Sequence, residues 1–384
     1  MTAGKPALVA RELASIDEVD AAAWNRLAGT DCPFLRHEFL AALEHSGCAT
    51  PRTGWTGAHR ALFDGDTLVA AAPAYRKDHS WGEFVFDFAW AQAWARAGRA
   101  YYPKLVCAVP FSPVGGQRLL TLPGRDAAQL RSALVRDLAA AAVDDGLSSA
   151  HALFINAAEH ECFAAQQWLL RRDVQFHWYN AHYRDFEHYL EGFTAEKRKK
   201  LRRERRRCAE AGIEFMTLHG PQIDAATLGQ IHALHAANFH RHGHEPYLNL
   251  AFFREIRTTL GETLMVKLAR HRGRVVGAAV FFRSPTVLYG RYWGACEDFH
   301  SLHFETCYHQ GIEYCIAEGL ERFEPGTQGE HKVARGFAPQ LTWSAHYIVE
   351  PDLRAALAEH LRREGHGVDA YAGEIGLHTP FRRG

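Results

Sequence analysis

The sequence predicts an α+β fold made of two similar units. Its 384 residues exceed the content of one ordinary core of roughly 150 residues, and 47% of them are apolar, enough for a sizeable interior. In each half, short strands come first, a long helix follows, and one further strand ends the pattern. We therefore expect a first domain over residues 1–180, a connecting segment over 181–212 and a second domain over 213–384 that holds the active cleft.

Strand and turn patterns identify the elements of the first half. Residues 60–76 contain two apolar runs around an Asp-Gly turn, which predicts a β-hairpin. Period-two alternation in EFVFDFAW (83–90) predicts a strand, and the alanine-rich stretch 125–146 has helical spacing. Short strands are also expected within 101–116 and 148–155.

The second half repeats this order. A strand at 211–218 precedes two helices within 223–242 and 248–261, and three strands joined by short turns occupy 262–295. An amphipathic helix over 302–320 and a strand from Arg322 complete the pattern.

Composition indicates a soluble, cytoplasmic protein with reduced thiols. The amino terminus lacks the features of a signal peptide, and no run approaches 18 apolar residues, so no membrane span is expected. The eight cysteines form no CxxC pair and no framework of close spacings. Five histidines crowd residues 232–246, but their spacing places them around several sides of a helix and into a loop, so we expect no metal site. They are His232, His235, His240, His242 and His244.

Residues 194–212 form a basic run in a chain whose 44 basic and 44 acidic residues balance. Between Lys197 and Arg207 there are nine basic residues and one acid, Glu204. A helix here buries little beyond Leu201 and Cys208, and self-repulsion favours a nearby anion. No aromatic residues interleave, so contacts should be to phosphates rather than bases. The alternative is a solvated linker helix. The candidate anion-binding residues are Arg198, Lys199, Arg202, Arg203 and Arg206.

Several segments carry a family resemblance, namely CPFLRHEFLAALEHSGC, YYPKLVCAVPFSPVGGQRLL, FHWYN followed by the basic run, YGRYWGA and LHFETCYHQGIEYCIAEGLERFEPGTQGEHKVARGF. With them the chain resembles a bacterial family of N-acyltransferases described as FemAB-like, over about residues 31–370. The resemblance implies two tandem GNAT-like (acetyltransferase-fold) domains, with mixed central sheets flanked by helices. The chain is more distantly similar to the Fem aminoacyltransferases, which transfer amino acids from aminoacyl-tRNA to peptidoglycan-precursor peptides. In that likeness His331 and Lys332 echo an FK motif, which implies a catalytic role for Lys332.

The loop before residue 302 bears on the identity of the acyl donor. GNAT enzymes that use acyl-CoA hold its pyrophosphate in a glycine-containing loop before a helix. Here CEDFHSLHFE has no glycine and three acids, Glu297, Asp298 and Glu305, which would repel pyrophosphate. Aminoacyl-tRNA is therefore favoured over acyl-CoA as co-substrate, and no other cofactor is expected.

The stretch GTQGEHKVARG (326–336) concentrates ionisable groups. Acyl transfer to an amine needs a base and donors for the oxyanion. Lys332 or Arg335 could be the cationic stabiliser and His331 or Glu330 the base, whereas a plain polar loop is the alternative. A cysteine nucleophile at Cys296 or Cys307 is not indicated.

Further candidates follow the strand YGRYWGA, where acetyltransferase folds open for substrate. Alternation along this strand places Arg291 and Trp293 on one face and Tyr292 on the other. The candidate substrate-binding residues are Arg291, Tyr292, Trp293, Glu297, His303, Glu305, Tyr102 and Lys104.

The sequence thus predicts an N-acyltransferase that moves an acyl or aminoacyl group to an amine, on a peptidoglycan precursor or another peptide, with tRNA as a possible partner. The alternatives are an acyl-CoA-dependent N-acetyltransferase and a non-catalytic RNA- or anion-binding protein that retains the fold.

Overall fold

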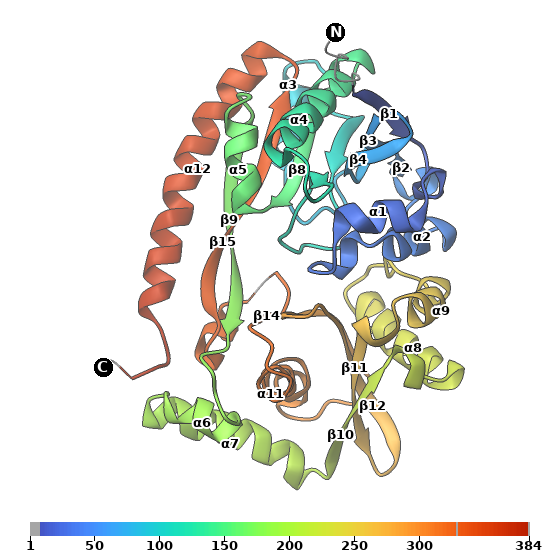
Figure 1. Cartoon of the computed structure of the whole chain (residues 1–384). Helices are drawn as coiled ribbons and strands as arrows, with labels where there is room; N and C mark the ends of the chain where they lie inside the picture. Colours follow the sequence, from blue (N-terminus) through green and yellow to red (C-terminus); the bar gives the residue numbers. More distant parts are fainter. Residues whose placement is uncertain (1–7, 328, 383–384) are drawn as a thin grey trace. The chain divides into compact units, whose positions relative to one another are not determined.

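The computed structural model describes residues 8–327 and 329–382, and the chain divides into two compact units. Unit 1 comprises residues 1–173 and 341–369, and unit 2 comprises 174–340 and 370–384. The chain passes between them along β9 (Leu169–Tyr179), β15 (Ala338–Ile348) and α12 (Pro351–Leu377) (Figure 1). Residues 341–369 therefore belong to unit 1, although they lie far from its other residues in the sequence.

Unit 1 contains two sheets. One has the order β1-β3-β4-β7 and is antiparallel; the other has the order β15-β8-β6-β5-β2, with β6 and β8 parallel. Its helices supply apolar faces to the core, where Leu134 and Leu138 of α4 pack with Val69 and Ala70 of β4. The strands are β1 (Val9–Leu13), β2 (Trp55–Gly57), β3 (His59–Asp64), β4 (Thr67–Ala72), β5 (Ala74–Lys77), β6 (Lys104–Cys107), β7 (Leu120–Thr121) and β8 (Ser149–Ile155), and the helices are α1 (Ala21–Ala28), α2 (His37–His45), α3 (Phe88–Arg96), α4 (Ala127–Asp144) and α5 (Ala157–Ala164).

The predicted hairpin is confirmed, because β3 and β4 pair across a turn in which Gly65 has φ of 60°, a value that suits glycine. The predicted strand over 83–90 is wrong, because α3 begins at Phe88. Trp90 and Trp94, four residues apart, are both buried on one side of that helix, and this helical burial overrides the short alternation before it.

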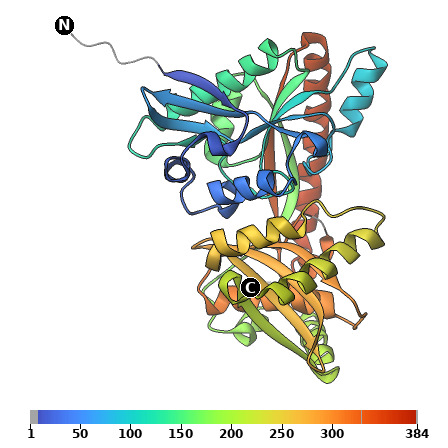
Figure 2. The ribbon, with the colours of Figure 1, turned by 90° about the vertical axis from the view of Figure 1, so that its right-hand side faces the viewer.

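Unit 2 has one mixed sheet, with the order β10-β11-β12-β13-β14-β9. β13 and β14 are parallel and the other neighbours are antiparallel. Helix α8 packs on β12 and β13, with α8 and α9 in front of the strands in Figure 2, and α11 packs on β13 and β14. The strands are β10 (Ile213–His219), β11 (Leu264–His271), β12 (Arg274–Arg283), β13 (Val287–Ala295) and β14 (Arg322–Glu324), and the helices are α6 (Phe186–Glu191), α7 (Ala195–Glu210), α8 (Ala225–Arg241), α9 (Leu250–Thr259), α10 (Leu302–Phe304) and α11 (Gln310–Ala317).

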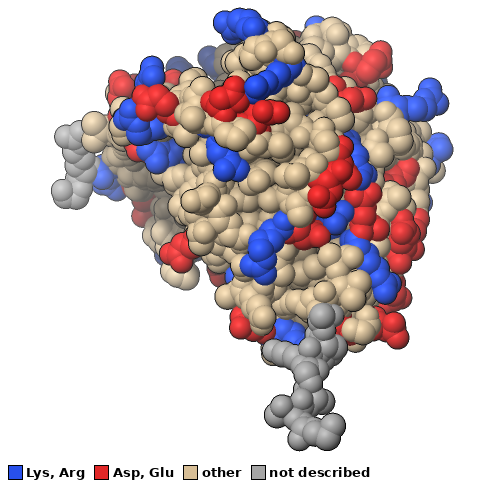
Figure 3. All heavy atoms as spheres, turned by 90° about the horizontal axis from the view of Figure 1, so that it is seen from above, with Lys and Arg blue, Asp and Glu red and all other residues tan. Residues whose placement is uncertain are grey.

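Both units therefore combine mixed sheets with flanking helices, as an α+β fold requires. The amphipathic helix expected over 302–320 forms, but a π-helical turn, Glu305–His309, lies between α10 and α11. None of the described helices is long and apolar enough to cross a bilayer. On the face shown in Figure 3, basic and acidic side chains lie side by side, which agrees with a formal net charge of zero.

Candidate functional site

The sheet of unit 2 opens where β13 and β14 part. The two strands pair only from Val287 with Arg322 to Tyr289 with Glu324. A register shift against β12 pairs Phe281 with Gly290 and Val280 with Tyr292, which leaves Arg291 as an extra residue, a β-bulge.

A cavity of about 140 Å³ lies at this opening. Arg291, Tyr292 and Trp293 all line it. Tyr292 packs against His235 and Phe253, whereas Trp293 packs against His303, so these two side chains lie on opposite faces as expected. Pro325, which follows β14, lines another side. The remaining lining residues are Ala279, Val280, Phe281, Gly290, His303, Cys307 and Tyr308.

The π-helical turn supplies Cys307 and Tyr308 to the cavity. One extra residue in a helical turn changes which neighbours share a face, so consecutive side chains can meet one space, and such turns are frequent at functional sites. Burial raises the pKa of Cys307 far above its usual value, which makes it a poor nucleophile at neutral pH.

Lys332 lies next to this cavity, in the 3-10 helix Glu330–Arg335. Its side chain is buried, with 2% of its surface exposed. Its Nζ donates a hydrogen bond of 2.7 Å to the carbonyl of Gly326, the residue that follows Pro325. Among the described residues no carboxylate lies within 4 Å of that Nζ. Burial lowers the pKa of Lys332 to about 7.

His331 and Tyr308 connect the same loop to the cavity. Tyr308 Oη and His331 Nε2 are 3.0 Å apart. Burial raises the pKa of Tyr308, so the phenol keeps its proton at neutral pH. Burial, followed by the charges of Arg335 and Lys332, lowers the pKa of His331, which keeps it neutral at pH 7.

Two other predicted catalytic residues point elsewhere. Glu330 is exposed and accepts a hydrogen bond from Tyr371 Oη at 2.9 Å. Arg335 is buried, donates to both carboxylate oxygens of Glu204 at 2.6 and 3.2 Å, and donates to the carbonyl of His331 at 2.7 Å. Neither lines the cavity.

The acidic residues near the start of α10 do not line this cavity either. Glu305 is buried and accepts from Gln310 at 2.8 Å, with Arg205 Nε 3.2 Å away. Glu297 lies 3.6 Å from Arg274 and lines a second cavity of about 840 Å³, together with Asp298, Arg241 and His300. His303 lines both cavities.

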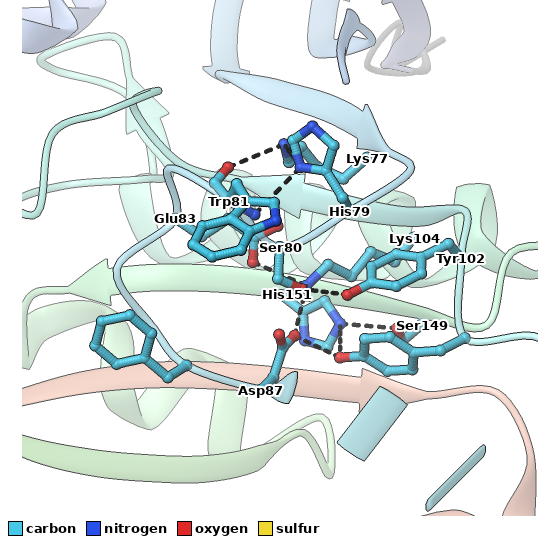
Figure 4. Close-up of polar contacts among 12 residues, drawn as sticks. Lys77, His79, Ser80, Trp81, Glu83, Asp87, Tyr102, Lys104, Ser149 and His151 are labelled. Atoms are coloured by element: carbon cyan, nitrogen blue, oxygen red, sulfur yellow. Dashed lines mark hydrogen bonds and ion pairs between the residues drawn. The ribbon is translucent and has the colours of Figure 1, made fainter. Parts of the chain in front are cut away.

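Lys104 and Tyr102 belong to unit 1 and to a buried charge cluster there (Figure 4). The Lys104 ammonium is fully buried and donates to Asp87 at 2.5 Å, Glu83 at 2.8 Å and Ser80 at 2.9 Å. Burial would lower the pKa of Lys104, but Glu83 and Asp87 outweigh it and raise the pKa above its usual value. Tyr102 is 2.8 Å from Ser80. The ammonium group of Lys104 is thus bound by two carboxylates of the protein itself, and the sequence does not reveal this pairing.

A histidine pair lies beside this cluster. His151 Nδ1 and His346 Nδ1 are 2.7 Å apart, and their other ring nitrogens contact Ser149 at 2.8 Å and Ser344 at 2.9 Å. Burial lowers the pKa of both histidines well below 6.5.

The basic run forms α7, and its two sides differ. Leu201 and Cys208 are buried as predicted, and Glu204 is buried with them. Of the predicted anion-binding residues, Lys199, Arg202, Arg203 and Arg206 are exposed and Arg198 is half-buried. Arg202 pairs with Glu187 at 2.5 Å and Arg206 with Glu210 at 3.4 Å.

The histidine-rich stretch lies on α8 and the loop after it. His235 is buried against the rings of Phe239, Phe253 and Tyr292, and His240 pairs with Glu245 at 3.1 Å. Within residues 8–327 and 329–382, no three His, Cys, Asp or Glu side chains are arranged to hold a metal ion.

The sequence matches the family model FemAB-like, described as peptidoglycan biosynthesis/recognition, over residues 15–383. The chain belongs to the FemAB-like family. Membership indicates a transferase of the acyl- or aminoacyl-transferring kind. No curated protein matches the sequence.

Solved structures share the fold at low identity. The C-terminal domain (DUF2156) ascribed to a lysylphosphatidylglycerol synthetase from Agrobacterium fabrum is 12% identical, with TM-score 0.50, covering 75% of this chain and 84% of that one. L-PGS from Bacillus licheniformis is 11% identical, with TM-score 0.50, covering 83% and 94%. FemX is 10% identical, with TM-score 0.49, covering 81% and 92%. The predicted α+β fold, with mixed sheets flanked by helices, is confirmed in both units of this FemAB-like protein.

Proposed function

We propose that this FemAB-like protein is an N-acyltransferase whose chemistry takes place in unit 2, at the opening between β13 and β14. The observation that carries the proposal is Lys332, a buried amine with a pKa of about 7 beside a cavity lined by Arg291, Tyr308 and His303. A buried cation without a carboxylate partner costs stability, and such groups concentrate at functional sites.

The corresponding opening in unit 1 is closed, which favours unit 2. There, β6 pairs in parallel with β8, as β13 does with β14. The chain then returns, and Gly116 forms a parallel bridge with Ile155 and donates to the carbonyl of Phe154 at 3.1 Å. Arg118, fully buried, donates to the carbonyl of Val114 at 2.6 Å and fixes this returning loop.

The reaction proceeds by direct attack. The acceptor amine forms a C–N bond with the carbonyl carbon of the donor, the C–O or C–S bond to the carrier breaks, and a proton moves from the attacking nitrogen to the leaving atom. The ammonium form of Lys332 stabilises the oxyanion. Tyr308 and His331 form a hydrogen-bonded pair next to the cavity that can relay the proton.

The donor is an aminoacyl-tRNA in this proposal. Support comes from the exposed basic side chains of α7, which suit a phosphate backbone. Acyl-CoA is the second candidate, favoured by the cavity of about 840 Å³ at the start of α10 and by Arg241 in its lining, and disfavoured by Glu297 and Asp298 in that lining. The family description suggests a peptidoglycan-precursor peptide as the acceptor.

Turnover assays test the proposal directly. Wild type and Lys332→Ala are compared with charged tRNA and with acyl-CoA, using peptide amines as acceptors. We expect kcat to fall by about 100-fold or more in the variant, with the donor Kd nearly unchanged. Equal turnover by the two proteins would refute the role of Lys332, and turnover with acyl-CoA alone would assign the other donor.

A further inference from the structure

Glu204 is the one acid among the nine basic residues of α7 between Lys197 and Arg207, and it faces inward. Its side chain is buried between Leu201 and Cys208, on the side of α7 opposite the exposed arginines. A buried carboxylate on such a helix requires specific partners.

Those partners come from the two segments that build the candidate site. Arg335, at the end of the 3-10 helix that carries Lys332, donates to both carboxylate oxygens of Glu204. His309, the last residue of the π-helical turn that carries Cys307 and Tyr308, is 2.8 Å from Glu204 Oε2. Both partners are buried, and the charge of Arg335 also lies 3.5 Å above the ring of Phe304.

Arg335 transmits this anchoring to the reactive loop, because its Nη1 also holds the carbonyl of His331 at 2.7 Å. A bidentate arginine–carboxylate pair fixes both position and orientation. We propose that Glu204 is a positioning residue, which fixes the loop of His331 and Lys332 and the π-helical turn against α7, so that the helix expected to bind the donor also sets the geometry of the reacting groups. This inference rests on the proposed function for its kinetic consequence, but its structural content is independent of it.

Two measurements without donor test the positioning. In the full-length protein, Glu204→Gln is expected to increase hydrogen exchange at residues 331–337 by about ten-fold or more, while the sheet amides keep their protection. The Lys332 amine, followed by NMR after ¹³C-reductive methylation and assigned by its loss in Lys332→Met, is expected to move its titration midpoint from about 7 toward 10.5 as water enters the loosened loop.

Glu313→Gln is the matched control. Glu313 also pairs with α7, through Arg205 at 2.7 Å, but it has no hydrogen bond to the 330–335 segment. It should leave both measurements unchanged. If Glu204→Gln does not fold, the double variant Glu204→Gln/Arg335→Met removes the pair without leaving a buried charge, and it should fold and show both effects. Unchanged exchange and an unchanged Lys332 midpoint in the folded variant would overturn the inference.

Kinetics separate this inference from the proposed function. Where Lys332→Ala lowers kcat by about 100-fold or more, Glu204→Gln should lower kcat by about 30-fold with KM within about two-fold. Loss in KM with kcat retained would overturn the positioning role. If wild type transfers no acyl group from any donor, the proposed function fails, while exchange and the Lys332 midpoint still decide the role of Glu204.

Discussion

Replacing Lys332 with methionine should make the protein more stable at pH 7 while removing its activity. The folded-state pKa of this amine is about 7, against 10.5 in the unfolded chain, so folding at pH 7 costs about 4 kcal/mol relative to a neutral side chain. Losing the hydrogen bond to Gly326 costs about 1 kcal/mol in return. Methionine has nearly the same shape and fills the space, which leaves a net gain of about 3 kcal/mol.

The sign depends on pH in a way that identifies the cause. Because the pKa of Lys332 is lowered on folding, the wild type gains stability as the pH rises from 7 toward 10.5. The advantage of Lys332→Met should therefore shrink by about 2 kcal/mol between pH 7 and pH 9. Urea unfolding at the two pH values measures both free energies.

Lys104→Met supplies the opposite case. Lys104 is equally buried, but Glu83 and Asp87 surround it, and removing it leaves two buried carboxylates without a cation. That variant should lose about 3–5 kcal/mol. Two results would contradict this reasoning. One is a loss of stability in Lys332→Met at pH 7, and the other is a difference in unfolding free energy from wild type that does not change with pH. Either would show that folding does not lower the pKa of Lys332.

Three other outcomes are expected. Below pH 6.5 His151 and His346 bind protons in the unfolded chain but not in the folded one. The free energy of unfolding should therefore fall by up to about 1.4 kcal/mol per pH unit for each histidine. Between pH 7 and 5, the urea midpoint of a variant with both residues changed to Gln should fall less steeply than that of the wild type. The affinity for tRNA should depend less on salt in the triple variant Arg202→Ala/Arg203→Ala/Arg206→Ala, with the slope of log affinity against log salt reduced by about 0.7 to 0.9 per lost phosphate contact. Its thermal midpoint should be nearly unchanged because these side chains are exposed. An unchanged slope would show that α7 is a solvated helix. Tyr308→Phe should lower kcat by about 10- to 100-fold with the donor Kd unchanged, and full activity would exclude the phenol from proton transfer.

Much of the fold follows from local patterns in the sequence. The hairpin of β3 and β4, helix α4, and the three strands from Leu264 to Ala295 are strongly periodic, and their patterns agree with the tertiary structure. α12 and the passage of β15 into unit 1 were not predicted, because membership of a unit depends on pairing between distant segments. The strand expected at 83–90 failed for a related reason, since packing of Trp90 and Trp94 decides that segment.

The candidate site was predictable in some of its members and not in its geometry. The sequence brings forward Arg291, Tyr292, Trp293 and His303, which line one cavity, and Lys332 beside it. It does not reveal Cys307 and Tyr308, because a π-helical turn has the same composition as an α-helix. The bulge at Arg291 is hidden in the same way, because the sequence does not show where a strand takes up one extra residue.

The two buried lysines explain why residue type alone does not assign function here. Lys104 comes from an apolar stretch and Lys332 from a stretch rich in ionisable groups, yet both are almost fully removed from solvent. Lys104 meets Glu83 and Asp87, which lie 21 and 17 residues earlier in the sequence, and becomes part of a closed ionic cluster. Lys332 meets a backbone carbonyl and, in the part of the chain that the structure describes, no carboxylate within 4 Å, so its proton is held weakly and can be exchanged near neutral pH. The difference between a structural and a reactive amine thus lies in which acids the fold brings to it, and the buried carboxylate of Glu204 is used by Arg335 and not by Lys332.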